Sequence, residues 1–177
     1  SKTIDRFRGR IIFPVKSISG RTIAFGGRIL GNKKNIAKYI NSPESLIYKK
    51  SKVLYGIYES KQSIAKENVC LLVEGYTDVV KLFQKDITNV VSSSGTAMTE
   101  SQIRLISRLT KNITVIFDGD SAGSRAALRG IDIILEQGMN VKICTLPDGE
   151  DPDSFSSQKS SPEISIFPRQ RNRRRWR

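Results

Sequence analysis

The sequence predicts an α/β protein, in which a small parallel sheet flanked by helices is preceded by a basic α+β subdomain. Short apolar runs alternate with helix-like segments between Val69 and Asp153, and this alternation is typical of a parallel sheet. Charge is also divided along the chain. Residues 1–68 hold 15 Lys and Arg against 4 Asp and Glu, whereas residues 69–153 hold 8 against 12. We therefore expect a basic unit over 1–68, an α/β unit over 69–153, and a basic tail over 154–177 that is disordered or not native to the domain.

Composition narrows the class of protein. The chain has 177 residues and a formal net charge of +13, which suits a polyanionic partner but also describes an ordinary solvated basic surface. No apolar run is long enough to span a membrane and no signal peptide is visible, so we expect a cytoplasmic protein without a membrane partner. The chain begins at Ser1 and not at Met, which suggests a fragment of something longer.

Metal chemistry based on cysteine or histidine is not expected. The sequence contains no histidine, and its two cysteines, Cys70 and Cys144, both lie inside apolar runs without a Cys-x-x-Cys partner. Buried, inert thiols are the simplest interpretation, and no zinc site is predicted.

The basic unit reads as a hairpin, a loop and a helix. Residues 10–15 and 21–28 have strand character, with a turn at 17–20 between them. Residues 32–43 are polar and predict a loop. Residues 53–66 predict a helix whose inward-facing side chains are Leu54, Ile57, Tyr58 and Ile64.

The α/β unit predicts four strands and three helices. The strands fall at 69–73, 89–91, 113–117 and 140–146, and the helices fall at 77–85, 99–110 and 121–137. Thr99 is a suitable cap for the second of these helices and Gly138 a suitable stop for the third. Because parallel strands need right-handed crossovers, we expect helices on both faces of the sheet.

Acidic residues follow three of these strands. Glu74 comes after the first, Asp118-Gly119-Asp120 after the third, and Asp148, Glu150, Asp151 and Asp153 after the last. The carboxyl ends of parallel strands form the usual ligand-binding edge, and clustered carboxylates suit Mg²⁺ in phosphoryl or nucleotidyl transfer. Each motif alone is weak, because Asp-x-Asp also occurs in haloacid-dehalogenase-type phosphatases and as ordinary turn acid. Three such motifs on one sheet make a metal site the favoured interpretation.

The basic unit offers candidate contacts to phosphates and bases. Arg28 follows a Gly-Gly pair that allows close backbone approach, and lysines surround Tyr39. Considered locally, a plain turn with an exposed arginine and a solvated loop are the favoured interpretations of these residues.

The motifs together resemble a known family. Glu74-Gly75-Tyr76-Thr77-Asp78 and Asp118-Gly119-Asp120-Ser121-Ala122-Gly123 resemble the Toprim domain of primases, topoisomerases and some nucleases. The flanking stretches at 10–15, 24–31, 38–44, 54–56 and 146–153 are similar to the bacterial replicative primase of the DnaG type. This resemblance covers roughly residues 6–155, and the tail beyond them does not resemble the family.

The resemblance implies a Toprim-type fold and the synthesis of short RNA primers from ribonucleoside triphosphates on a single-stranded DNA template. Carried over by motif, Glu74, Asp118 and Asp120 are expected to be the catalytic metal ligands, joined by Asp78, Asp151 and Asp153. More than one Mg²⁺ or Mn²⁺ ion is implied. The residues expected to bind nucleic acid or nucleotide are Arg28, Lys38, Tyr39, Asn41 and Lys50.

The resemblance also implies partners and leaves alternatives. The family's zinc-binding domain and the region that meets the replicative helicase are absent from this sequence. Another Toprim phosphodiester activity, such as a nuclease, and a non-catalytic nucleic-acid-binding fragment both remain open. A phosphatase-like or receiver domain is disfavoured by the basic amino-terminal unit.

Overall fold

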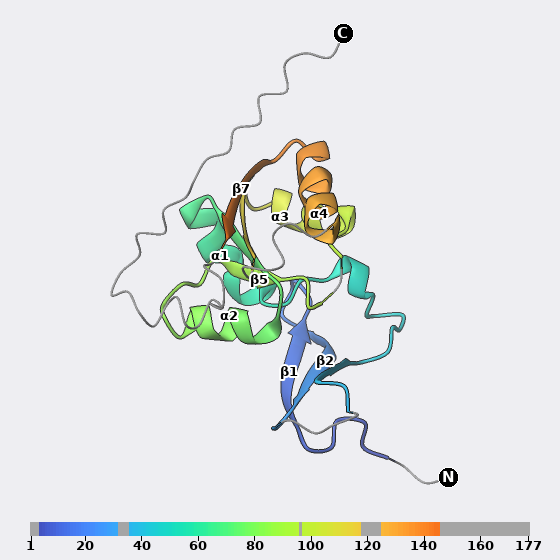
Figure 1. Cartoon of the computed structure of the whole chain (residues 1–177). Helices are drawn as coiled ribbons and strands as arrows, with labels where there is room; N and C mark the ends of the chain where they lie inside the picture. The colour runs from blue at the N-terminus through green and yellow to red at the C-terminus, as the bar shows by residue number, and fades with distance from the viewer. Residues whose placement is uncertain (1–3, 32–35, 96, 118–124, 146–177) are drawn as a thin grey trace.

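The computed structural model describes residues 4–31, 36–95, 97–117 and 125–145, and these form two sheets. Figure 1 shows the first sheet as a separate lobe below the helices and the second sheet. We call the first sheet with the segment up to Lys52 the basic lobe. Within the described residues, no helix is long and apolar enough to cross a membrane.

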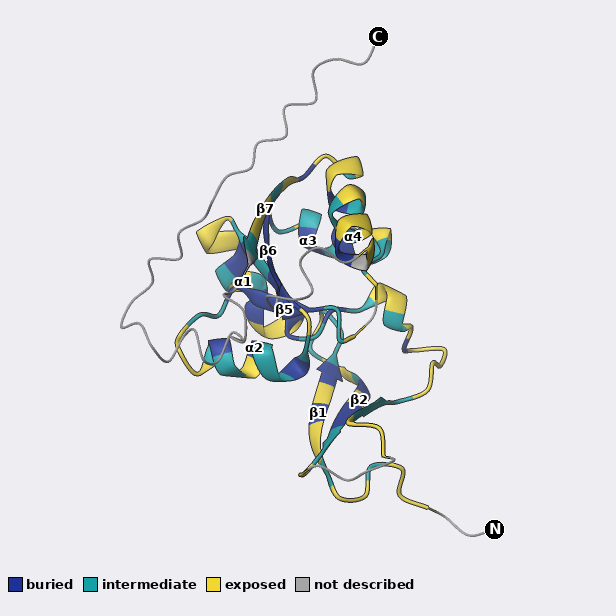
Figure 2. Cartoon of the chain, viewed as in Figure 1, coloured by how far each residue is buried: buried dark blue, intermediate teal, exposed yellow. Residues whose placement is uncertain are grey.

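The basic lobe is built on an antiparallel hairpin. Strand β1 (Arg10–Lys16) pairs with β2 (Thr22–Ile29), and the turn closes through a hydrogen bond from the Gly20 amide to the Ser17 carbonyl at 2.9 Å. This confirms the predicted hairpin. Strand β1 alternates buried and exposed residues towards its end (Figure 2), and its buried side chains Phe13 and Val15 face the rest of the protein.

The loop prediction for residues 32–43 is wrong at Tyr39–Asn41, which form strand β3 on the edge of β2. Three residues without an apolar alternation give no strand signal in the sequence. The strand exists because β2 continues through Gly26 and Gly27 to Ile29 and so presents its edge to β3.

The second sheet has the strand order β5-β4-β6-β7 and is parallel throughout. Its strands are β4 (Cys70–Val73), β5 (Val90–Ser92), β6 (Asn112–Phe117) and β7 (Asn140–Thr145). The helices are α1 (Ile57–Glu67), α2 (Tyr76–Phe83), α3 (Glu100–Ser107) and α4 (Arg125–Glu136). The predicted α/β alternation is therefore confirmed, with ends that differ by a few residues.

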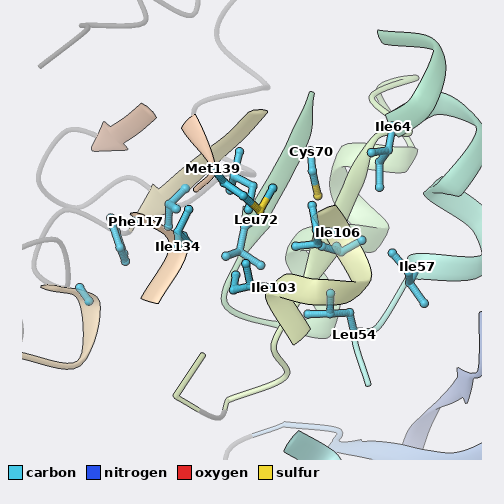
Figure 3. Packing of buried hydrophobic residues seen from close by; sticks show 14 residues of the cluster. Leu54, Ile57, Ile64, Cys70, Leu72, Ile103, Ile106, Phe117, Ile134 and Met139 are labelled. Atoms are coloured by element: carbon cyan, nitrogen blue, oxygen red, sulfur yellow. The ribbon is translucent and has the colours of Figure 1, made fainter. Parts of the chain in front are cut away.

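Helices cover both faces of this sheet, as predicted, but unevenly. Side chains of α1, α3 and α4 pack with Cys70 and Leu72 in the main core, part of which Figure 3 shows. The opposite face carries Val73, Val90 and Ile116, against which α2 packs Val79 and Leu82. The alternation of residues along β4 between the two cores is the period-two pattern of a strand buried on both faces.

The helix predicted over 53–66 starts later, at Ile57. Residues 50–52 form a short 3₁₀ turn (η1), and Tyr55 is extended, exchanging two backbone hydrogen bonds of 3.0 Å with Ser92 of β5. Gly56 then takes φ +83°, which favours glycine, and caps the helix.

Tyr58 does not face inward as predicted. The residue is 37% exposed, and its ring lies against Gly20 of the hairpin turn, with Lys61 Nζ 4.4 Å from the ring centroid. A tyrosine has an apolar body and a polar tip, so periodicity alone does not decide which of them is covered.

Both cysteines are free thiols, as predicted. Cys70 is fully buried, and burial raises its pKa, whereas Cys144 is only half-buried. The expectation of a buried thiol is therefore correct for Cys70 and too strong for Cys144.

Candidate active site

Glu74 stands at the carboxyl edge of the parallel sheet, as predicted. It follows the last residue of β4 and is exposed. Its backbone carbonyl accepts a hydrogen bond from the amide of Gly95, in the loop after β5, at 3.3 Å. Beside it lies a cavity of about 350 Å³, whose walls include Leu72, Val115 and Phe117. The glutamate is thus held at a rim between two strand ends.

Asp78 has a structural task that the sequence analysis did not foresee. One of its carboxylate oxygens accepts the backbone N–H of Gly75, the N-cap residue of α2, at 2.9 Å. A Cβ on Gly75 would lie 3.0 Å from that oxygen, so the carboxylate would have to shift slightly to admit a larger residue. Asp78 therefore fixes the first turn of α2, directly after Glu74, and has one oxygen engaged within the protein.

The other predicted acids, Asp118, Asp120, Asp151 and Asp153, lie outside the described residues. The strand that precedes the first two can be placed: β6 pairs in parallel with β4 through Leu72 and Val115, and ends at Phe117. In the part of the chain that the structure describes, there is no group of three or more residues able to hold a metal ion.

Three predicted binding residues of the basic lobe, Arg28, Tyr39 and Asn41, lie on the edge formed by the paired strands β2 and β3. Arg28 on β2 pairs with Tyr39 on β3, and its guanidinium lies 5.9 Å from the Tyr39 ring centroid. Arg28 Nε is the one buried side-chain polar atom without a hydrogen-bond partner among the described residues. A buried donor that lacks a partner is costly, and a phosphate oxygen would satisfy it.

This edge contacts the first turn of α2. The hydroxyls of Tyr39 and Thr77 share a hydrogen bond of 3.2 Å, and the hydroxyl of Tyr76 donates to the Asn41 side chain. Tyr76 and Thr77 follow Glu74 by two and three residues. The structure therefore brings Tyr39 and Asn41, with Arg28 beside Tyr39, to the helix turn that follows Glu74.

Comparisons with known proteins agree with this arrangement. A family model for the DNA primase catalytic core, N-terminal domain, matches residues 1–61, and a Toprim-like model matches residues 71–156. A DNA primase from Halalkalibacterium halodurans is 46% identical over 154 residues, which are 87% of this chain and 25% of that protein. The chain belongs to the DnaG-type primase family.

Solved primase structures share this fold. The Aquifex aeolicus primase, with its zinc-binding and RNA polymerase domains, superposes with a TM-score of 0.81 at 44% identity, covering 87% of this chain and 38% of that one. A DnaG primase catalytic domain bound to ssDNA gives 0.79 at 44% identity, covering 89% and 51%. The chain spans about a quarter of the length of the curated primases that it matches.

Lys38 of this DnaG-type chain is exposed on a segment held by Arg10. The Arg10 guanidinium donates to the carbonyls of Ala37 at 2.9 Å and of Lys38 at 3.3 Å. Arginine suits this task because its fork of donors can serve several carbonyls at once. Arg10 therefore sets the backbone from which the Lys38 side chain reaches solvent.

The backbone at Lys50 is held by a residue that the sequence did not single out. Gln102 of α3 is fully buried, and its amide donates to the carbonyls of Lys50 at 3.1 Å and Val53 at 2.9 Å. Its oxygen accepts the Thr99 backbone N–H at 3.1 Å, which completes a capping box. The Thr-x-x-Gln spacing predicts the capping box, but no local sequence pattern predicts the contact with η1.

The basic lobe and the Toprim-type sheet of this chain meet through aromatic rings. Tyr76 is 2% exposed, stacks on Phe13 with a centroid distance of 5.2 Å, and meets Tyr55 edge-on at 4.7 Å. Burial raises the pKa of Tyr55 and of nearby Tyr48 to about 12. These phenols are therefore neutral at physiological pH.

Proposed function

We propose that the chain joins ribonucleotides into short RNA primers on a single-stranded DNA template. In each step the 3′-hydroxyl of the growing primer attacks the α-phosphate of a ribonucleoside triphosphate, and pyrophosphate leaves. The observation that carries this proposal is the contact between the edge with Arg28, Tyr39 and Asn41 and the helix turn directly after Glu74. This contact supports a site in which groups suited to a phosphate lie near the acid that we propose as a metal ligand.

We propose that Arg28 and Lys38 hold phosphates of template or nucleotide. The Arg28 guanidinium has a buried Nε–H that a phosphate oxygen can satisfy, and the Tyr39 ring beside it adds a face on which a base can stack. Lys38 and Lys50 supply further positive charge from the same lobe. Asn41 contributes by its contact with α2.

The acidic edge would hold Mg²⁺ or Mn²⁺, with more than one ion. Glu74, Asp118 and Asp120 are the proposed catalytic ligands, and Asp78, Asp151 and Asp153 the supporting acids. A hard divalent ion takes carboxylate oxygens and neutralises charge on the phosphates. The chemistry of the donors fits, because Glu74 is an exposed carboxylate at a strand end and Asp78 keeps one oxygen outside its capping bond.

Partners follow from the family. Binding of single-stranded DNA is supported by the relative that was solved bound to ssDNA. We propose a replicative helicase as a further partner of the full-length family. We also propose a cytoplasmic location and a division into a basic unit over 1–68, a Toprim-type unit over 69–153 and a basic tail over 154–177.

The proposal is tested with the chain, a single-stranded template, labelled ribonucleotides and Mg²⁺ or Mn²⁺. Template-dependent oligoribonucleotides are expected, and Glu74→Gln and Asp118→Asn should abolish them. Glu100→Gln is the matched control, because Glu100 is an exposed helical acid paired only with Arg104 at 3.3 Å among the described residues. Template cleavage would instead indicate a nuclease. Template binding without products in the presence of either ion would contradict the proposal.

A further inference from the structure

We infer that Tyr76 is a positioning residue that fixes Glu74 against the phosphate-binding edge of the basic lobe. The inference deepens the proposed function and rests on it. Tyr76 lies two residues after Glu74, at the first position of α2, and is almost fully buried. Its contacts reach both lobes, so it decides how they meet at the site.

The ring of Tyr76 fills the junction between the lobes. It stacks on Phe13 of β1, with planes 11° apart, and meets Tyr55 at 87°. A Cβ on Gly26 of β2 would lie 2.6 Å from the ring. The glycine is therefore required by the close approach of the tyrosine ring to the β2 backbone.

The hydroxyl of Tyr76 belongs to a series of contacts around Glu74, which we call the circuit. It donates to the Asn41 side chain on β3, and the Ser94 side chain, in the loop after β5, lies beside it and opposes the rise that burial causes in its pKa. The next residue in that loop, Gly95, donates its amide to the Glu74 carbonyl at 3.3 Å. Asn41, the Tyr76 hydroxyl, the loop and the Glu74 backbone are thus linked in one chain of contacts.

Packing alone does not account for the hydroxyl. A phenylalanine ring would make the same stack and the same edge contact, whereas a buried hydroxyl must be hydrogen-bonded to avoid a desolvation cost. Its partner Asn41 and the neighbouring Ser94 both belong to segments that border the site. Tyr48 is a useful contrast, because it is equally buried in the same aromatic cluster but lies outside the circuit.

The test compares Tyr76→Phe with the control Tyr48→Phe in the full 177-residue chain. For Tyr76→Phe we expect kcat for primer synthesis to fall about tenfold while KM for the ribonucleotide stays within about twofold. We also expect the Gly95 amide, followed by hydrogen exchange, to exchange about tenfold faster. Tyr48→Phe should leave kcat and the exchange of Gly95 within about twofold of the unmodified chain.

Asn41 supplies a second measurement. If the hydroxyl acts through Asn41, combining Tyr76→Phe with Asn41→Ala should lower kcat no further than the slower single variant does. Independent losses that multiply would overturn this link. Equal kcat for the two tyrosine variants, or a loss of kcat without faster exchange at Gly95, would overturn the positioning role.

Failure of the proposed function has a separate signature. If the unmodified chain makes no primers, the proposed function fails. The positioning role of Tyr76 is then tested by the hydrogen-exchange comparison alone. Faster exchange at Gly95 in Tyr76→Phe only would then support the circuit, and equal exchange in both variants would reject it.

Discussion

Replacing Gln102 by leucine tests whether one buried amide holds the basic turn η1 against α3. The substitution keeps an apolar stem of similar length and deletes the groups that meet Lys50, Val53 and Thr99. The backbone bond from Gln102 N–H to the Thr99 hydroxyl, at 3.3 Å, can remain. The variant therefore isolates the side-chain amide from the rest of the cap.

The expected loss follows from the groups left without partners. Two carbonyls and one amide N–H lose a hydrogen bond, at about 1–3 kcal/mol for each group that stays buried. Lys50 is only half-buried, so water can replace part of its bond. The leucine adds apolar burial worth about 1 kcal/mol. We therefore expect the free energy of unfolding to fall by about 2 kcal/mol, or about 4–8 °C in Tm for a chain of this size.

Urea unfolding followed by circular dichroism measures this loss, and Gln62→Leu is the matched control. Gln62 is exposed on α1, so the same chemical change there should alter stability by less than about 0.5 kcal/mol. The loosened turn should also weaken binding of a single-stranded oligonucleotide to the level of Lys50→Ala. Equal stability of the two glutamine variants would refute the anchoring role.

Three further outcomes are expected. Lys38→Ala and Arg28→Ala should each reduce the slope of log affinity for single-stranded DNA against log salt by about one phosphate contact, measured by fluorescence anisotropy; an unchanged slope would remove these residues from the binding surface. Gly26→Ala should lower the free energy of unfolding by about 1–3 kcal/mol because its Cβ would meet the Tyr76 ring, whereas Gly130→Ala, whose Cβ would lie 3.5 Å from a side chain, should be neutral or stabilising in the same denaturation assay. The stability that neutral Tyr48 contributes should be constant below about pH 9 and be lost as pH rises through about 10–12, because burial raises the pKa of Tyr48 to about 12 and the unfolded chain loses that proton first. The free energy of unfolding of Tyr48→Phe, measured in urea titrations at successive pH values, should therefore fall less steeply across this range.

The sequence predicted the parallel sheet well because three of its strands, β4, β5 and β6, are buried on both faces. Such strands appear as uninterrupted apolar runs, and the helices between them carry a regular apolar stripe. The capping residue Thr99 and the stop at Gly138 were equally visible, since both act within a few residues. Local signals therefore sufficed wherever the stabilising contact was itself local.

The contacts between the lobes could not be predicted in the same way. Strand β3 depends on a partner edge, and the pairing of Asn41 with Tyr76 joins residues 35 positions apart. The role of Gly26 was hidden for the same reason, because the ring that excludes its side chain comes from α2. Motifs supplied the residues of the candidate site, and only tertiary packing supplied their neighbours.

That packing divides the predicted binding residues into two kinds. Tyr39 and Asn41 use their polar ends on Thr77 and Tyr76, so their side chains hold the protein together at the site. Arg28 and Lys38 carry the charge. Arg28 has a buried donor that lacks a partner among the described residues, and Lys38 is exposed. A polyanion would therefore be held by the charged pair, while the other pair sets the distance between that polyanion and Glu74. One oxygen of Asp78 likewise accepts a hydrogen bond at the start of α2. Residues on both sides of the junction therefore fix the helix that follows the proposed catalytic acid.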